Sequence, residues 1–145
     1  MEVGPLFGGN ALAAVSAAGA VRLPLFVTRT LARRAEARLI VFGAHETMPC
    51  LSGYEPAYRA ALADRNGSRR LFGFAEQAEY DRAGRVLLPP MMRWKGRIEA
   101  LALFVGTGGA FEIWNPAVAR EIGDPDLREI ADYRLRHIEE RETVE

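Results

Sequence analysis

An internal repeat at a shift of 65 residues limits the fold of this chain more than any other feature. Each copy runs from a glycine-containing turn into a short apolar strand ended by proline, "GAVRLP" in the first half and "GRVLLP" in the second. A helix-like segment and another apolar strand follow in both halves. One copy is too small to close a core alone, so we expect the two to pack together. Six residues recur at this shift: Phe7 and Phe72, Gly8 and Gly73, Gly19 and Gly84, Val21 and Val86, Leu23 and Leu88, Pro24 and Pro89.

The second half carries a hairpin signature. The stretch "EALALFVGTGG" predicts a strand over 101–105, and its glycines predict a turn into a second strand over 111–114, which Asn115 and Pro116 end. A phosphate-binding loop is disfavoured because no Lys-Ser/Thr pair follows "GTGG".

The first half is organised similarly. Residues 38–43, "RLIVFG", predict a buried strand, and residues 54–65 predict a short amphipathic helix that "NGS" at 66–68 breaks, so we place the main internal boundary there. Alternation over 71–76 predicts a strand that leads into the second turn.

Several residues invite a functional interpretation but favour a structural one. Met91, Met92 and Trp94 are expected in the core of a short helix, and Trp114 in packing or a subunit interface. Cys50 with His45 and Glu46 resembles a nucleophile with its base, but the segment lies in an expected hairpin. We therefore predict no enzyme activity.

Composition narrows the class of protein. The 145 residues are 49% hydrophobic, which suits one domain or two small ones. No apolar run reaches the ~18 residues of a membrane helix, and the first residues lack a secretory signal pattern, so we expect a cytoplasmic protein with no membrane partner. A single cysteine excludes an intrachain disulfide, and His45 and His137 are too few for a metal cluster, so we predict no cofactor.

Charge divides unevenly along the chain. The formal net charge is zero, but residues 1–120 carry 15 basic against 10 acidic residues, and residues 121–145 carry 4 against 9. Asp124, Pro125 and a spaced apolar stripe predict a helix over 124–140; the stripe is Leu127, Ile130, Leu135 and Ile138. This acidic helix is a solvated end, an oligomer contact or an autoinhibitory mimic of DNA, in that order of preference.

The turn "DRAGRVLLPP" at 81–90 concentrates polar chemistry. Gly84 permits a positive φ, Arg85 offers a fork of donors to guanine or phosphate, and Asp81 is placed to orient that fork. Arg82 suits a phosphate contact. On these residues alone an ordinary solvated turn is favoured.

The stretch "YDRAGRVLLPPMMRWKGRIEALALFVGTGGAFEIWNPAV" resembles the second repeat of the MraZ family, regulators of the bacterial division and cell-wall gene cluster. The resemblance covers residues 7 to about 123. It implies an α+β fold of two SpoVT/AbrB-like swapped-hairpin repeats, 7–57 and 80–123, forming a pseudo-two-fold double-repeat barrel with short helices, followed by an acidic C-terminal helix and tail over 124–145. It also implies that the arginine of the Asp-x-x-Gly-Arg element, Arg85, contacts DNA.

The first copy departs from that pattern. Ser16 stands in place of the aspartate and Ala20 in place of the arginine, and only Gly19 is kept. Arg22 has the same strand parity as Ala20 and is a candidate replacement. We therefore expect the second copy to carry most of the DNA contact.

The resemblance implies a sequence-specific DNA-binding transcriptional regulator, a repressor that acts as a homo-oligomeric, octamer-like ring on double-stranded operator DNA in the cytoplasm and nucleoid. The alternative is a diverged ring-forming paralogue with weak or no DNA binding, serving as a protein-interaction module. An AbrB-like antitoxin fits less well, because such proteins normally have one repeat and a disordered tail.

Overall fold

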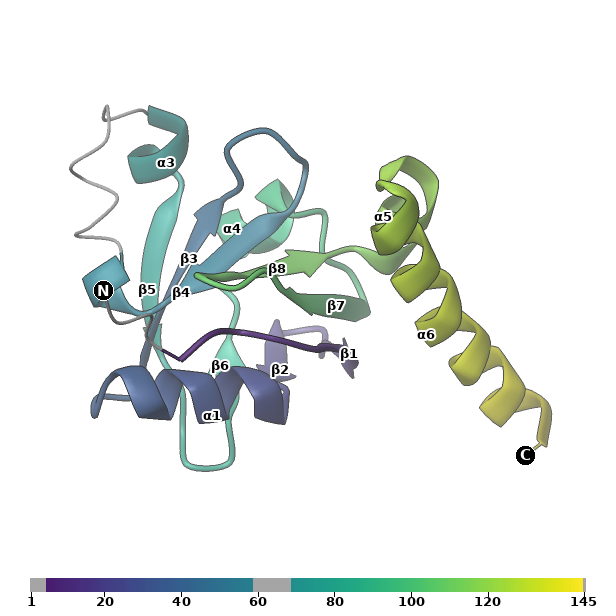
Figure 1. The fold of residues 1–145 in the computed structure, drawn as a ribbon, viewed down its shortest axis with the longest axis horizontal. Helices are drawn as coiled ribbons and strands as arrows, with labels where there is room; N and C mark the ends of the chain where they lie inside the picture. The colour runs from purple at the N-terminus through teal and green to yellow at the C-terminus, as the bar shows by residue number, and fades with distance from the viewer. Residues whose placement is uncertain (1–4, 59–68, 145) are drawn as a thin grey trace.

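The structure, a computed structural model, describes residues 5–58 and 69–144, with side chains described as far as residue 138, and has a mixed α+β fold (Figure 1). The strands are β1 Asn10–Ala14, β2 Ala20–Arg22, β3 Leu39–Ala44, β4 Leu51–Tyr54, β5 Ala75–Glu79, β6 Arg85–Leu87, β7 Leu101–Gly106 and β8 Phe111–Trp114. The helices are α1 Leu25–Arg34, α3 Arg69–Gly73, α4 Pro90–Lys95, α5 Pro116–Ile122 and α6 Pro125–Val144.

Two antiparallel sheets interleave the halves of the chain. The larger sheet has the order β1-β7-β8-β4-β3-β5, and β2 pairs with β6 in a separate two-stranded ribbon. The first strand of each half pairs with the long strand of the other half, β1 with β7 and β5 with β3. The fold of each half therefore depends on the other, as the small size of one repeat predicts.

The repeat is preserved in the backbone. Strands β5 and β6 and the start of α4 lie 65 residues after β1, β2 and the start of α1. The shift falls to 62 between β3 and β7 and to 60 between β4 and β8, because the two halves differ in the lengths of their connections. The 65-residue repeat thus extends over the turn, the ribbon strand and the helix start.

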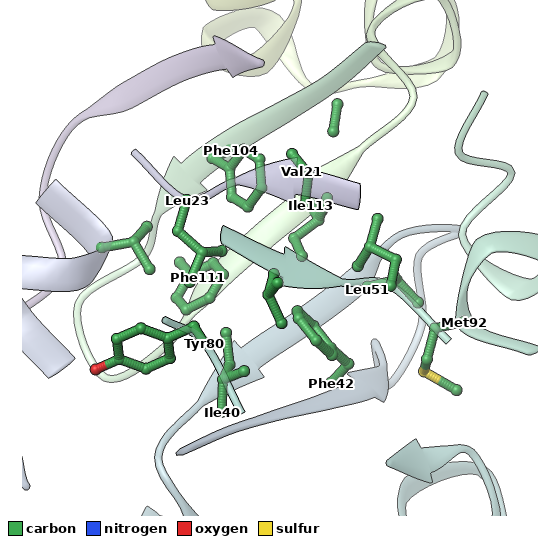
Figure 2. Packing of buried hydrophobic residues seen from close by; sticks show 14 of the residues in the cluster. Val21, Leu23, Ile40, Phe42, Leu51, Tyr80, Met92, Phe104, Phe111 and Ile113 are labelled. Carbon is green, nitrogen blue, oxygen red and sulfur yellow. The ribbon is translucent and has the colours of Figure 1, made fainter. Parts of the chain in front are cut away.

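The core lies between the sheet and the ribbon. Val21 and Val86 point from the ribbon into the core and are 2% and 4% exposed, and Figure 2 shows Val21 and Leu23 packed against aromatic residues of the sheet. Phe104, Phe111 and Ile113 of β7 and β8 are fully buried. Fully burying a side chain of this size stabilises the fold by about 1.5–3 kcal/mol. The alternate ribbon residues that face inward therefore hold the ribbon against the sheet.

The C-terminal helix α6 begins as predicted. The Asp124 Oδ1 accepts a hydrogen bond from the Leu127 N–H at 2.9 Å, and Pro125 occupies the first turn. Leu127 and Ala131 are buried, whereas Leu135 and Ile138 are half-buried, so the apolar stripe packs only along its first part. Figure 1 shows α6 extending away from the sheet.

Some of the other elements predicted from the sequence agree with the structure and others do not. The strands over 38–43, 101–105 and 111–114 and the glycine hairpin that joins the last two are confirmed within one residue or two. The strand predicted over 71–76 is wrong in its first half, because residues 69–73 form α3 and β5 starts at Ala75. Alternation over so few residues does not separate a strand from a helical turn.

The predicted burial of Trp94 and the predicted closed barrel are both wrong. Trp94 is 72% exposed and not in the core, whereas Met92 is fully buried, because a short helix on the surface buries one face only. Among the described residues the strands form an open sheet and a ribbon, not a closed barrel. Residues 56–58 are helical, but the remainder of the helix predicted over 54–65, and the boundary at 66–68, fall outside the described residues.

None of the helices among the described residues has both the length and the apolar character of a membrane span.

Candidate nucleic-acid interface

The two glycine turns adopt the same conformation in both halves. Gly19 and Gly84 have φ angles of 95° and 83°, in the left-handed region that glycine tolerates. The Leu23 N–H donates to the Gly84 carbonyl at 2.8 Å, and the Leu88 N–H donates to the Gly19 carbonyl at 2.9 Å. These reciprocal bonds tie the two turns together at the ends of the ribbon.

Asp81 stabilises the second turn mainly through the backbone. Its Oδ1 accepts hydrogen bonds from the N–H groups of Ala83 and Arg85, each at 2.9 Å, and its Oδ2 lies 3.5 Å from the Arg85 Nε. The hydrogen bond from the Arg85 N–H, more than the charges of Arg85 and Arg22, lowers the pKa of the Asp81 carboxyl below its usual value. The predicted orienting contact to Arg85 is therefore present but secondary.

In the first turn an uncharged side chain accepts the equivalent backbone hydrogen bond. The Ser16 hydroxyl accepts a hydrogen bond from the Ala20 N–H at 3.0 Å, at the position equivalent to the bond between Asp81 and Arg85. Ser16 therefore keeps one of the two backbone hydrogen bonds that Asp81 accepts, and it cannot form the ion pair.

The ribbon brings two predicted arginines together on one exposed face. Arg22 lies directly opposite Arg85 in the β2–β6 register, and both side chains point to solvent while Val21 and Val86 point inward. Opposed residues of an antiparallel pair have Cβ atoms about 4.5–5.5 Å apart, and like charges there repel. The Arg22 Nε donates to the Ala83 carbonyl at 3.0 Å, which ties this side chain to the second turn.

Arg85 remains available for a ligand. Its side chain is 70% exposed, and within the described residues no hydrogen bond engages its terminal amino groups. Arg82, in the same turn, is also exposed. The structure thus gathers Arg22, Arg82 and Arg85 around one turn, with Asp81 and Gly84 shaping it, while Gly19 shapes the other turn.

Arg93 lies at the first turn and was not among the residues predicted from the sequence. From α4, its Nη1 donates to the Ala17 carbonyl at 3.0 Å, and its side chain packs against Gly19. At the same shift of 65 residues its equivalent is Thr28, whose methyl group lies against Gly84. The sequence does distinguish these positions: the half that keeps the aspartate has Arg93 where the other half has Thr28.

A second polar cluster joins His45, Cys50 and Glu112, whose ligand atoms all lie within 4.8 Å of one another. The His45 Nδ1 accepts hydrogen bonds from the N–H groups of Thr47 and Met48, each at 3.1 Å, so the proton of the neutral ring is on Nε2, which faces Glu112 Oε2 at 3.2 Å. A metal at Nε2 would displace that proton. The ring is therefore arranged to connect the 45–50 loop to β8.

Cys50 is not arranged as a nucleophile. It is 2% exposed, and burial, assisted by the Glu112 carboxylate, raises the pKa of its thiol far above the usual value. The indole N–H of Trp114, which is also buried, donates to the other Glu112 oxygen at 3.0 Å. Trp114 therefore serves in packing, which is one of the two roles predicted for it.

Comparison with known proteins places this arrangement in a class. No family model matches the chain. A transcriptional regulator MraZ of Saccharophagus degradans is 30% identical over 122 residues, a match that covers 76% of this chain and 82% of that protein. Shorter matches reach transcriptional regulators MraZ of Coxiella burnetii, 38% identical over 64 residues, and Thiobacillus denitrificans, 39% identical over 74 residues. These cover 44% and 46% of this chain, but only 38% and 50% of the relatives.

The class that these similarities define is the transcriptional regulators. The extent of the first match shows the family more closely: this chain belongs to the MraZ family.

Proposed function

We propose that this protein is a sequence-specific DNA-binding regulator whose contact surface is the β2–β6 ribbon with its two turns. The observation that carries the proposal is the opposed pair Arg22 and Arg85 on an exposed face. Two like charges held side by side are unfavourable in the free protein, and an anionic backbone between them relieves the repulsion.

In this proposal each arginine makes a different contact with DNA. Arg85 presents a free fork to a base edge or phosphate, Arg82 contacts phosphate from the same turn, and Arg22 adds a partly engaged cation. Arg93 places a guanidinium beside the first turn, where Ala20 has removed one, and its Nε is buried without a hydrogen-bond partner within the described residues. Asp81, Gly84 and Gly19 hold the turns and do not read DNA.

The proposal extends to architecture. We interpret 7–57 and 80–123 as two SpoVT/AbrB-like repeats with swapped hairpins and 124–145 as an appended acidic segment. The reciprocal pairing of β1 with β7 and of β5 with β3 supports this interpretation, as do the symmetric hydrogen bonds of the two turns.

The same proposal includes assembly and physiology. A homo-oligomeric ring would present several weak contacts to one DNA molecule, and the high effective concentration of the linked contacts would raise the overall affinity. The ring would act as a repressor of the division and cell-wall gene cluster in the cytoplasm and nucleoid. The relatives are named as transcriptional regulators and not as enzymes, so we assign no reaction or cofactor to the chain.

A mobility-shift titration with the DNA upstream of the protein's own gene tests the proposal. We expect binding that is tighter than to scrambled DNA of the same length at two salt concentrations, with binding to the scrambled DNA weakening more steeply as salt rises. Equal affinity for both DNAs at both concentrations would contradict sequence-specific binding.

A second candidate is a ring-forming protein-interaction module that has lost DNA binding. The exposed Leu87, 56% accessible on the same ribbon face as the arginines, favours it, because an apolar side chain at this position suits a protein partner. The absence of any mobility shift, with the ring intact, would favour this alternative.

A further inference from the structure

A groove of about 1160 Å³ lies between β1, α1 and the second turn. Arg22 and Arg82 of the proposed DNA surface line it, so the groove continues that surface toward α1. Figure 1 shows the turn between β5 and β6 beside α1, and the methyl group of Thr28 lies against Gly84. The groove and the second turn therefore belong to one surface.

Two arginines outside the ribbon also line this groove, Arg29 from α1 and Arg38 just before β3. Both are exposed, and neither forms a salt bridge with any of the described residues. The Tyr80 N–H donates to the Arg38 carbonyl at 3.0 Å, which places Arg38 beside the start of the second turn. Arg38 also lines a smaller hollow, of about 440 Å³, together with Arg85. The positive charge therefore continues from Arg85 past the second turn to α1.

The groove carries more positive than negative charge. The charged residues that line it are Arg22, Arg29, Arg38, Arg82, Glu36 and Asp81. The Asp81 carboxylate already accepts two backbone hydrogen bonds and faces Arg85. An excess of cations on one concave surface attracts a ligand that carries several negative charges. The apolar part of the lining is formed largely by small side chains, those of Ala11, Ala13, Ala14, Ala32, Ala35 and Ala83.

The positions equivalent to these arginines in the other half of the repeat are uncharged. At the shift of 65 residues, the counterparts of Arg22, Arg29, Arg82 and Arg85 are Leu87, Trp94, Ala17 and Ala20. Leu87 and Trp94 are 56% and 72% exposed, so these positions are also open to solvent. The two halves therefore differ at these positions in charge and not in accessibility, and the difference favours a polyanionic ligand at the second turn.

We propose that this groove holds the sugar–phosphate backbone of the bound DNA, with Arg29 and Arg38 as phosphate contacts beyond the ribbon. This inference rests on the proposed function, because it extends the same surface. The phosphates face the guanidinium groups, and the apolar edges of the deoxyribose rings lie on the alanine lining. Contacts with phosphate position a protein on the duplex and carry no sequence information. Arg29 and Arg38 therefore add affinity for DNA of any sequence.

Salt titrations of the full-length protein with two duplexes test this inference. The duplexes are the DNA upstream of the protein's own gene and a scrambled DNA of the same length. Arg29→Ala and Arg38→Ala are compared with the wild-type protein and with Arg29→Lys and Arg38→Lys, which keep the charge. The matched control is Arg69→Ala, which removes an exposed arginine outside the groove. Light scattering establishes the oligomeric state of each variant before the titration.

We expect each of the two groove alanine variants to reduce the slope of log K against log salt by ~0.9 on both duplexes. Each should weaken binding to both duplexes by the same factor, so that the preference for the upstream DNA is unchanged. The lysine variants and Arg69→Ala should keep the wild-type slope, because the number of phosphates that the protein neutralises is then the same.

Wild-type slopes for both groove alanine variants would overturn this inference, as would a loss of preference between the duplexes, which would mean that these arginines read bases. A changed oligomeric state with an unchanged slope would also overturn it, by assigning the groove to a contact between subunits. If Arg85→Ala reduces the slope and neither groove variant does, this inference fails and the proposed function stands. If the wild-type protein binds both duplexes equally, sequence-specific binding fails, and the slopes still test the phosphate contacts. If it binds neither duplex, both proposals fail.

Discussion

Asp81 shows how one side chain combines structure and charge. Its Oδ1 closes the turn through two backbone N–H groups, and its Oδ2 reaches the guanidinium of Arg85. At the equivalent turn Ser16 accepts a hydrogen bond from one backbone N–H, that of Ala20, and carries no charge. The difference between the two repeats is therefore a difference of surface charge on a shared backbone geometry, which is why the first copy still folds like the second.

The lowered pKa of Asp81 predicts an acid-dependent contribution to stability. A carboxyl with a lower pKa in the folded state stabilises the fold above its unfolded pKa, about 3.9, and this contribution disappears as pH falls through the folded value. Asp81→Asn should flatten the acid limb of the stability curve measured by urea unfolding between neutral pH and pH 3. Ser16→Ala is the control, because it removes a turn contact without a titrating group; an acid limb unchanged by Asp81→Asn would contradict this role.

Burial of Cys50 predicts a thiol that is inert in the native protein. The raised pKa leaves almost no thiolate at neutral or mildly alkaline pH, and the sulfur is closed to solvent. We expect iodoacetamide to leave the native thiol unmodified over hours at pH 8 and to modify it fully in denaturant, as measured by intact mass. If native Cys50 reacts as fast as an exposed thiol, the loop over 45–50 opens in solution or the Cys50 side chain is not buried.

At the scale of elements, sequence patterns predicted well wherever glycine or proline marked an end. The turn glycines, Pro89 before α4, and Asn115 with Pro116 after β8 all lie where predicted. The pattern failed at α3, where a short apolar alternation was compatible with a strand. It also failed for Trp94, because exposure depends on which face of α4 meets the core, and that depends on contacts from the other repeat.

The β4–β8 pair at the centre of the large sheet predicts a strict requirement for Gly53. Gly53 lies opposite Phe111, and a Cβ at this position would overlap the Phe111 ring. Gly53→Ala should lower the free energy of unfolding by about 1–3 kcal/mol through overpacking, measured by urea denaturation. Gly8→Ala is the matched control, since nothing lies within 4 Å of its added Cβ. Equal effects of the two substitutions would mean that the sheet relaxes around Phe111.

At the scale of the whole molecule, Arg34 links the two repeats. Its Nη1 contacts Glu55 at 2.9 Å and the Gly109 carbonyl at 2.8 Å, and its guanidinium stacks on Phe7 at 4.5 Å. The α1 helix of the first half thereby holds the β7–β8 turn of the second. Both side chains of the Arg34–Glu55 pair are nearly buried.

Truncation of Arg34 should therefore destabilise the whole domain. Arg34→Met leaves Glu55 buried without its partner, which costs about 3–5 kcal/mol, whereas Arg34→Met with Glu55→Gln should be less destabilising. Thermal and urea unfolding of the two variants measure the difference. If the double variant proves no more stable than the single one, the destabilisation comes from the carbonyl contacts of Arg34 and not from the uncompensated charge of Glu55.

The sequence could predict the candidate site only in part. The 65-residue repeat located both turns, and the position of Arg22 on the same parity as Ala20 was enough to place it on the ribbon face. The sequence could not reveal that Arg22 lies opposite Arg85, because that pairing joins residues 63 apart through a register set by the fold. Comparison across the repeat could single out Arg93, which stands where the first half has Thr28, but it could not show that Arg93 contacts Ala17 in the other repeat.

The salt dependence of DNA binding by Arg85→Ala, Arg22→Ala and Arg69→Ala, each at matched oligomeric state, tests the proposed surface most directly. We predict that Arg85→Ala reduces the slope of log K against log salt by ~0.9 for each phosphate that the arginine no longer neutralises, that Arg22→Ala, partly engaged with Ala83, reduces it less, and that Arg69→Ala leaves it unchanged. Equal slopes for the three variants, or a slope that Arg85→Ala does not change, would contradict the assignment of the ribbon as the DNA-binding surface.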